Sequence, residues 1–137
     1  MKAVALYHME EIPVFVNNFL AMDALSHLSH ERRCDVKLCL FELLTNIFTH
    51  GEGDLVVRMR YAVSSGQMAL IIYEEGGHWD GQGILTGARC LEDGLFDEGG
   101  RGLYLVQRVS DELAYCGCCK GVFVRMGLRG GAHGKGQ

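Results

Sequence analysis

Apolar and polar residues follow one another in patterns that predict both helices and strands. Residues 12–20 carry apolar side chains at helical spacing, with Pro13 in the first turn, where a helix tolerates proline. After a polar link, residues 31–50 predict a longer helix whose apolar face is wide enough to be packed on most sides. The run Gly51-Glu52-Gly53-Asp54 ends this helix.

Shorter apolar segments predict β-strands. Residues 2–8 form one candidate strand, and residues 55–63 and 67–73 predict an antiparallel hairpin closed by a Ser-Ser-Gly turn. A second hairpin is predicted from residues 113–118 and 121–128.

Between the two hairpins, residues 76–102 show neither helical nor strand periodicity, and 9 of these 27 residues are glycine. A stretch of this length without periodicity inside a compact domain favours a functional loop. A third helix is predicted from residue 101 to about residue 112. Its inward-facing side chains are expected to be Leu103, Leu105, Val106 and Val109.

Together these elements predict an α+β fold, a two-layer sandwich in which about three helices cover one face of a mixed, mostly antiparallel sheet. The length of 137 residues, with 48% hydrophobic and 22% charged residues, fits a single domain with a sizeable core. We expect this domain to span residues 1–128 and a mobile, glycine-rich tail to follow at 129–137.

Charge and hydropathy narrow the functional classes. The net charge is −4 and the longest basic run is Arg32-Arg33, which argues against nucleic-acid binding driven by phosphate neutralisation. No uncharged stretch is long enough to cross a membrane and the N-terminus has no signal-peptide core, so we expect a cytoplasmic protein. The six cysteines are then expected to be reduced thiols.

The cysteines cluster once, at Cys116, Cys118 and Cys119. A structural zinc site usually needs two ligand pairs, and the sequence lacks the second pair. We therefore interpret these three residues as thiols buried in a strand, where they act as small hydrophobic side chains.

Glu42, Asn46 and His50 follow one another at intervals of four residues, which places them on one stripe of the second predicted helix. Such a stripe is commonly solvated, but the apolar residues on both sides leave little of this helix for water. Embedded polar groups need partners, and a carboxylate one turn from a carboxamide could hold a hard cation or a water beside one. His50 could either cap the helix end or line a pocket.

Two glycine-rich junctions add candidate binding groups. The strand that ends at Glu74-Glu75 runs into Gly76-Gly77, which lets a ligand approach the backbone beside the carboxylates. Trp79, shortly after, is interpreted as an anchor or a hydrophobic plug. Gly99-Gly100-Arg101-Gly102 opens the third helix, where free backbone N–H groups and a guanidinium could bind phosphate. Each junction is also compatible with a plain turn.

The order of these motifs is more specific than any one of them. A Glu-x-x-x-Asn box on a helix, an acidic strand end with glycines, a long glycine-rich loop and a Gly-x-Gly helix start resemble the layout of the GHKL ATPases, the superfamily of gyrase and the histidine kinases. Within it the chain is most similar to the small anti-sigma-factor serine/threonine kinases of bacterial partner switching, in size and in the boxes FELLTNIFTHG and GGRGLYLVQRVSDEL. The resemblance covers about residues 2–128 and implies a Bergerat-type ATPase fold.

The resemblance implies a role for each motif residue. Asn46 would ligate a Mg²⁺ ion that bridges the phosphates of ATP, and Glu42 would be the general base that takes the proton from an attacking hydroxyl or water. Glu74 would accept a hydrogen bond from the adenine amino group, Gly76 would belong to the same nucleotide site, and residues 81–98 would form the lid. The phosphates would be bound by Gly100, Arg101 and Gly102.

Two positions depart from the family at the adenine end. The family usually has Asp where Glu74 stands, and it tends to have Thr where Val122 follows Gly121, so one carboxylate is longer and one hydroxyl is missing.

Two hypotheses about the function follow. The first, which Glu42 favours, is an ATP-dependent protein serine/threonine kinase whose substrate is a STAS-domain anti-anti-sigma protein and which sequesters a sigma factor. The second is a non-catalytic GHKL-like module that binds partners and has a degraded adenine pocket. Neither hypothesis involves nucleic acid or a membrane, and both are compatible with a homodimer.

Overall fold

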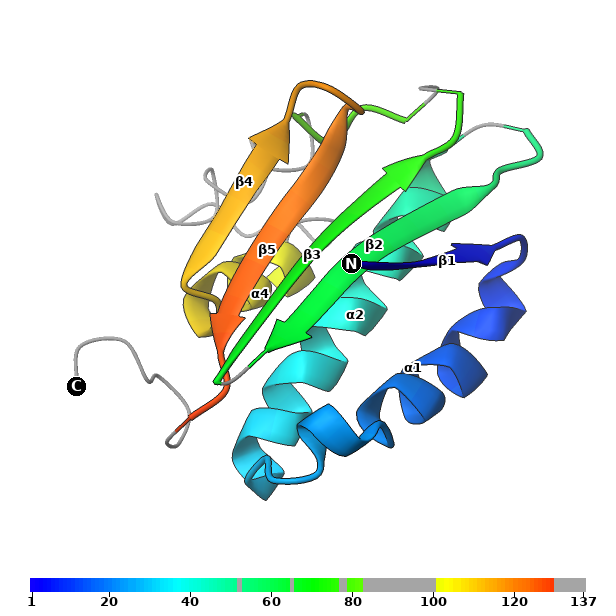
Figure 1. The fold of residues 1–137 in the computed structure, drawn as a ribbon. Coiled ribbons are helices and arrows are strands. Elements are labelled where there is room, and N and C mark those ends of the chain that lie inside the picture. The colour runs from blue at the N-terminus through cyan, green and yellow to red at the C-terminus, as the bar shows by residue number, and fades with distance from the viewer. Residues whose placement is uncertain (52, 65, 77–78, 83–100, 130–137) are drawn as a thin grey trace.

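The computed structural model describes residues 1–51, 53–64, 66–76, 79–82 and 101–129. Five strands form one sheet in the order β1-β2-β3-β5-β4, and all four neighbouring pairs are antiparallel. Three α-helices lie on one face of this sheet (Figure 1). The strands are β1 (Lys2–Leu6), β2 (Val57–Ser64), β3 (Gln67–Glu74), β4 (Glu112–Cys116) and β5 (Gly121–Gly127), and the helices are α1 (Ile12–Leu20), α2 (His30–His50) and α4 (Arg101–Val109).

This architecture confirms the predicted α+β two-layer sandwich, with the correction that the described strands make a purely antiparallel sheet rather than a mixed one. Two short 3-10 helices, Met9–Glu11 and Asp23–Leu25, flank α1. Both hairpins form where the apolar segments and turn residues predict them.

The core fills the space between the sheet and the helices. Because successive strand residues point to opposite faces, every second residue of a strand faces the helices. Ile72 pairs with Met59 on one side and with Val122 on the other, and all three side chains are buried on the helical side. From α2 the core receives the buried side chains of Val36, Cys39, Leu40, Leu43, Leu44 and Ile47.

Helix α2 begins and ends with recognisable caps. Ser29 is the N-cap, and its hydroxyl oxygen accepts a hydrogen bond from the backbone N–H of Arg32 at 3.1 Å. At the other end the Gly51 N–H donates to the Ile47 carbonyl at 3.0 Å. A Cβ on Gly51 would come within 2.9 Å of that carbonyl and closer still to the side chain of Leu55. Glycine therefore fits the position at which the sequence predicts the end of the helix.

Helix α4 is shorter than predicted, because it ends at Val109 rather than near residue 112. The Asp111 N–H donates to the Arg125 carbonyl at 2.9 Å, and the Asp111 carboxylate accepts from the Gly127 N–H at 2.6 Å. These bonds attach the chain to β5 directly after the helix, so Glu112 begins a strand instead of ending a helix.

Leu105 of α4 does not face the core as predicted. Leu103 and Val106 are buried and Val109 is partly buried, as predicted, but Leu105 is 43% exposed. Residues two positions apart in an α-helix are separated by about 200° around its axis, so Leu105 points away from the core into which Leu103 points.

The β4–β5 connection also differs from the prediction. Strand β4 ends at Cys116, and the next four residues, Gly117 to Lys120, form a turn. Cys118 is exposed, and Cys116 and Cys119 are partly exposed. The interpretation of these three residues as buried strand thiols is therefore wrong.

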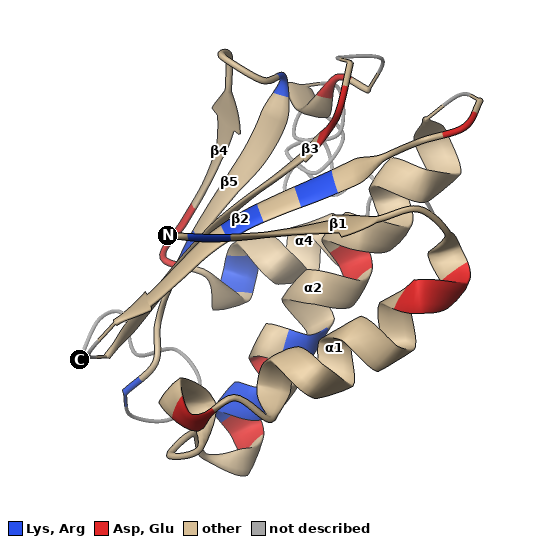
Figure 2. Cartoon of the chain, turned by 45° about the vertical axis from the view of Figure 1, so that its right-hand side comes forward, with Lys and Arg blue, Asp and Glu red and all other residues tan. Residues whose placement is uncertain are grey.

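Charges are interspersed along α2, where Figure 2 shows basic and acidic residues near one another. No helix in the described part of the chain is long and apolar enough to cross a membrane. Most of the predicted lid, residues 83–98, lies outside the described residues, as do Gly100 and residues 130–137 of the predicted tail. The domain boundary at residue 128 stays a prediction.

Candidate functional site

The candidate site is built from α2, the end of β3 and the start of α4. Glu42 and Asn46 lie in the second half of α2, Glu74 is the last residue of β3, and Gly102 lies in the first turn of α4. Helix α2 packs against both α4 and β3. The sheet and the core therefore hold together segments that are far apart in the sequence.

The Glu42 carboxylate lies directly against Gly102, and a Cβ on Gly102 would collide with it. Backbone N–H groups in the first turn of a helix have no intrahelical partner, and this end of the helix dipole is positive. The carboxylate proposed as a base and the backbone proposed to bind phosphate thus meet at one place. Gly102 has no side chain at the point of closest approach.

Asn46 is almost completely buried, with 8% of its surface exposed. Its side-chain Nδ2 donates to the Glu42 backbone carbonyl at 2.6 Å, so the amide nitrogen is held by its own helix. The carboxamide oxygen is then the group left to accept a hydrogen bond or to coordinate a cation. The expectation that a polar group embedded in this helix needs a partner is met here.

His50, the third residue of the polar stripe, is exposed in the last turn of α2. Of the two interpretations, this exposure favours a helix-end residue over a pocket residue.

The two acidic residues at the end of β3 face opposite sides of the sheet. Glu74 is 3% exposed and continues the buried series of Leu70 and Ile72, whereas Glu75 is exposed and accepts hydrogen bonds from Arg58 at 2.9 and 3.0 Å. Glu74 is therefore the carboxylate that faces the helical layer. Gly76 follows with φ at 98°, in the region that favours glycine, so the chain turns sharply after the strand.

A short segment, residues 79–82, packs over the start of β5. The Gly81 N–H donates to the Lys120 carbonyl at 2.8 Å, and a Cβ on Gly81 would come within 2.7 Å of Val122 Cγ2. Trp79 is 4% exposed within the core, which fits a hydrophobic plug, and its Nε1 has no hydrogen-bond partner among the described residues. No pattern in the sequence predicts this packing, because Gly81 and Val122 are far apart in the chain and carry no recognisable motif.

A small cavity of about 290 Å³ lies beside the end of β3. It is lined by Tyr73, Glu74, Glu75, Gly76, Cys118, Cys119 and Lys120. The β4–β5 turn is therefore part of the surroundings of the candidate site, which sequence analysis missed.

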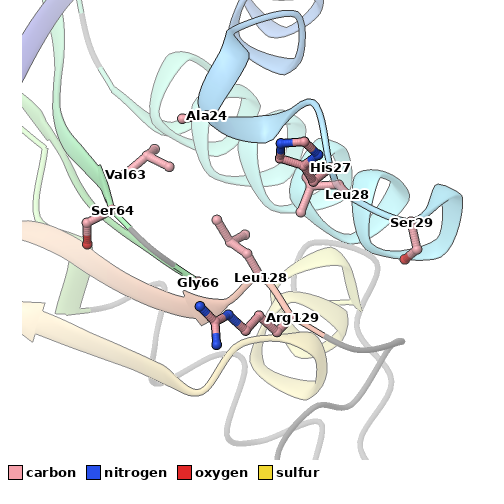
Figure 3. Close-up of a pocket in the computed structure, with 9 residues that line it drawn as sticks. All are labelled: Ala24, His27, Leu28, Ser29, Val63, Ser64, Gly66, Leu128 and Arg129. Atoms are coloured by element: carbon pink, nitrogen blue, oxygen red, sulfur yellow. The ribbon is translucent and has the colours of Figure 1, made fainter.

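A larger cavity, of about 780 Å³, lies at the opposite end of the sheet. Figure 3 shows that it is lined by residues from the chain before α2, from the β2–β3 turn and from the end of β5, with the Arg129 guanidinium at its rim. Gly66 directly precedes β3, which ends at Glu74, so this cavity is separated from the candidate site by the length of β3.

The fold and these side chains define an α+β protein with the groups of a nucleotide site: a buried acid at a strand end, a carboxylate and a carboxamide on a helix, and a glycine at a facing helix start. Residues 5–127 match the histidine kinase-like ATPase domain, so the chain belongs to this family. The family implies ATP binding. A search of curated proteins found no match to the chain.

The described residues fit a bound nucleotide in two respects. Gly102 presents backbone without a side chain at the start of α4, beside the Glu42 carboxylate, where phosphate would be held, and the buried Trp79 Nε1 has no acceptor among the described residues. No cluster of three or more His, Cys, Asp and Glu side chains within the described residues could hold a metal ion by itself. A Mg²⁺ ion at Asn46 would therefore be held largely by the phosphates and water, which is common for this ion.

Proposed function

We propose that this ATPase domain is an anti-sigma-factor-like serine/threonine kinase that acts in the cytoplasm. In this proposal it binds Mg-ATP, phosphorylates a serine or threonine of a STAS-domain anti-anti-sigma protein, and sequesters a sigma factor or a similar regulator. The similarity of the FELLTNIFTHG and GGRGLYLVQRVSDEL boxes to that group supports it. The observation that carries it is the contact between the Glu42 carboxylate and Gly102, because the proposed base and the proposed phosphate-binding backbone lie side by side.

Each predicted residue has a task in such a transfer. The Asn46 carboxamide oxygen would ligate Mg²⁺, and Glu42 would hold and accept the proton of the attacking hydroxyl. Gly102 would offer its backbone to the phosphates together with Gly100 and Arg101. Phosphoryl transfer needs mainly positioning of the reactants and neutralisation of charge, and these groups provide both types of interaction.

Two substitutions test this assignment by separating binding from catalysis. Asn46→Ala should abolish Mg-dependent ATP binding, because it removes the proposed metal ligand. Glu42→Ala should retain ATP binding and lose phosphotransfer by about 10²–10⁴-fold, the range expected when a general base is removed. Calorimetry with Mg-ATP measures the first effect, and transfer of labelled γ-phosphate to STAS-domain proteins of the same organism measures the second.

His50→Ala is the matched control, since His50 lies on the same stripe of α2 but is exposed at its end. It should change neither readout. Unchanged ATP affinity in Asn46→Ala would remove the proposed metal site. Phosphotransfer at the wild-type rate in Glu42→Ala would show that Glu42 is not the base.

A second candidate function is a non-catalytic module that binds partners, and one observation favours it. Val122 is completely buried and packs against Gly81, so an apolar contact occupies the position at the proposed adenine end where the family tends to have a hydroxyl. Glu74, one methylene longer than the usual Asp, must retract to meet the same amino group. Both departures weaken recognition of adenine.

We therefore expect weak ATP binding and reduced discrimination between ATP and GTP. A lost or strained hydrogen bond to a partly buried group costs about 1–3 kcal/mol, which is roughly tenfold to hundredfold in affinity. The double substitution Glu74→Asp with Val122→Thr should strengthen ATP binding specifically. Titration of both nucleotides against wild type and double variant measures the effect.

The single variant Val122→Thr serves as the control for stability, because a hydroxyl in a buried site carries a cost of its own when it has no partner. Tight, ATP-selective binding by the wild type, with no gain from the double substitution, would show that Glu74 already recognises adenine. The second candidate function would then lose its support.

A further inference from the structure

The turn between β4 and β5 brings thiols together at the surface. Cys116 ends β4, Cys118 and Cys119 lie in the turn, and none of the three is in a disulfide. The spacing Cys116-Gly117-Cys118-Cys119 places the first and last cysteine three residues apart, as in dithiol motifs of the form Cys-x-x-Cys.

Cys116 is the register partner of Gly121 across the β4–β5 hairpin, and the Cys119 sulfur lies beside Gly121, so the two thiols are close neighbours. The pKa of Cys116 is lowered, first by the neighbouring Cys119 thiol and then by the backbone N–H groups of Cys119 and Cys118. Burial raises the pKa of Cys119, and the neighbouring Cys116 adds to this. Cys116 is therefore the more acidic thiol of the pair.

The backbone fits this arrangement of sulfurs. A Cβ on Gly121 would come within 3.1 Å of the Cys119 sulfur, so the glycine leaves the space into which that side chain folds. Lys120 adopts φ at 59°, the left-handed region that a side chain rarely enters. The chain accepts an unfavourable backbone conformation at the point where it closes this turn.

We propose that Cys116 and Cys119 form a redox-active dithiol, a modification site that closes to an intramolecular disulfide and thereby weakens nucleotide binding at the adjacent end of β3. Its oxidant is a low-molecular-weight disulfide of the glutathione class. The regulatory consequence rests on the proposed nucleotide site, whereas formation of the disulfide does not.

The chemistry is thiol–disulfide exchange in two steps. The Cys116 thiolate attacks one sulfur of the small disulfide, which breaks the S–S bond, forms a mixed disulfide and releases one thiolate. Cys119 then gives up its proton and attacks the Cys116 sulfur, which forms the internal S–S bond and releases the second small thiolate. Two protein thiols are oxidised, one small disulfide is reduced to two thiols, and the protons pass to the departing thiolates. A small dithiol reverses both steps.

The turn is connected to the candidate nucleotide site by two contacts. Cys119 and Lys120 line the cavity of about 290 Å³ that also contains Glu74. The Lys120 carbonyl accepts the hydrogen bond that holds Gly81 over Val122, at 2.8 Å. Closing a bond of about 2.05 Å between the two sulfurs must shift the turn that carries this carbonyl.

Mass spectrometry of the full-length protein after treatment with oxidised glutathione tests the dithiol. Trypsin releases residues 109–120 as one peptide, which contains Cys116, Cys118 and Cys119 and no other cysteine. We expect an internal bond between Cys116 and Cys119 in the wild type and in Cys118→Ser, and its loss in Cys116→Ser and Cys119→Ser. The exposed Cys34 serves as the internal reference and should form only a glutathione adduct. An adduct without an internal bond in the wild type, or a bond that needs Cys118, would overturn the proposal.

Calorimetry with Mg-ATP on reduced and oxidised protein tests the consequence. We expect about tenfold weaker binding after oxidation, as for the loss of one hydrogen bond of the Gly81–Lys120 kind. Cys116→Ser, which cannot form the bond, should lose the difference between the two treatments. Equal affinities in the wild type would overturn the regulatory effect and leave the dithiol in place. Absence of ATP binding by the reduced protein would overturn the nucleotide site and this regulation, while the peptide analysis still decides on the thiols.

Discussion

Replacing Gly102 with alanine is expected to abolish phosphotransfer without weakening the fold. The new Cβ would collide with the Glu42 carboxylate, which lies at the end of a flexible side chain and would swing away from the start of α4. Because the position is helical, exchanging glycine for alanine favours the folded backbone by about 0.5–1 kcal/mol. We therefore expect the free energy of unfolding to be equal or higher, and the rate of transfer to fall by about 10²–10⁴-fold as the base loses its position.

The double variant Gly102→Ala with Glu42→Ala isolates the cause. If the alanine acts by displacing the carboxylate, the two losses should not add, and the double variant should be no slower than Glu42→Ala alone. Fully additive losses would show that Gly102 acts on the nucleotide independently of Glu42. Transfer at the wild-type rate in Gly102→Ala would contradict the contact as the basis of the proposed function.

Replacing Arg32 with methionine is expected to cause the largest loss of stability. The Arg32 side chain is 1% exposed, and its guanidinium binds Asp35 at 2.8 Å, the Gly127 carbonyl at 2.8 Å and the Val109 carbonyl at 3.2 Å. One side chain thus joins the start of α2 to the ends of β5 and α4. Methionine keeps much of the volume but leaves a largely buried carboxylate and two carbonyls without this donor, at a cost of about 3–5 kcal/mol.

Urea denaturation followed by circular dichroism measures this loss, which is a large part of the stability of a typical domain. The double variant Arg32→Met with Asp35→Asn should recover part of it, because it removes the uncompensated charge. A matched change at the neighbouring Arg33, whose guanidinium donates to two carbonyls before α2, should cost less. A loss below about 1 kcal/mol in Arg32→Met would show that the buried ion pair is replaceable by packing.

Local patterns in the sequence were sufficient for most of the elements. The apolar spacing predicted α1 and α2, Gly51 marked the end of α2, and a Ser-Ser-Gly turn marked the β2–β3 hairpin. Strand alternation accounts for the burial of Glu74 while Glu75 is exposed, since neighbours in a strand face opposite sides. Each of these features depends on residues within a few positions of one another.

The order of the motifs also predicted the family, because a glutamate and an asparagine one turn apart and a glycine helix start are visible without a fold. The same information did not show which atoms meet. The contact of Glu42 with Gly102 joins residues on two helices, and no local pattern predicts that the carboxylate would rest on the glycine rather than beside it.

Tertiary structure alone decided the remaining features, each of which depends on groups distant in sequence. By residue type, Arg32 is expected to be solvated at the start of its helix, and it is buried because carbonyls of β5 and α4 accept hydrogen bonds from its guanidinium. Helix α4 ends earlier than predicted because Asp111 forms hydrogen bonds with β5. The spacing of apolar residues within the helix cannot predict hydrogen bonds to a distant strand. Periodicity reports which face of an element is apolar, whereas the sheet and core determine which polar groups are brought together between elements.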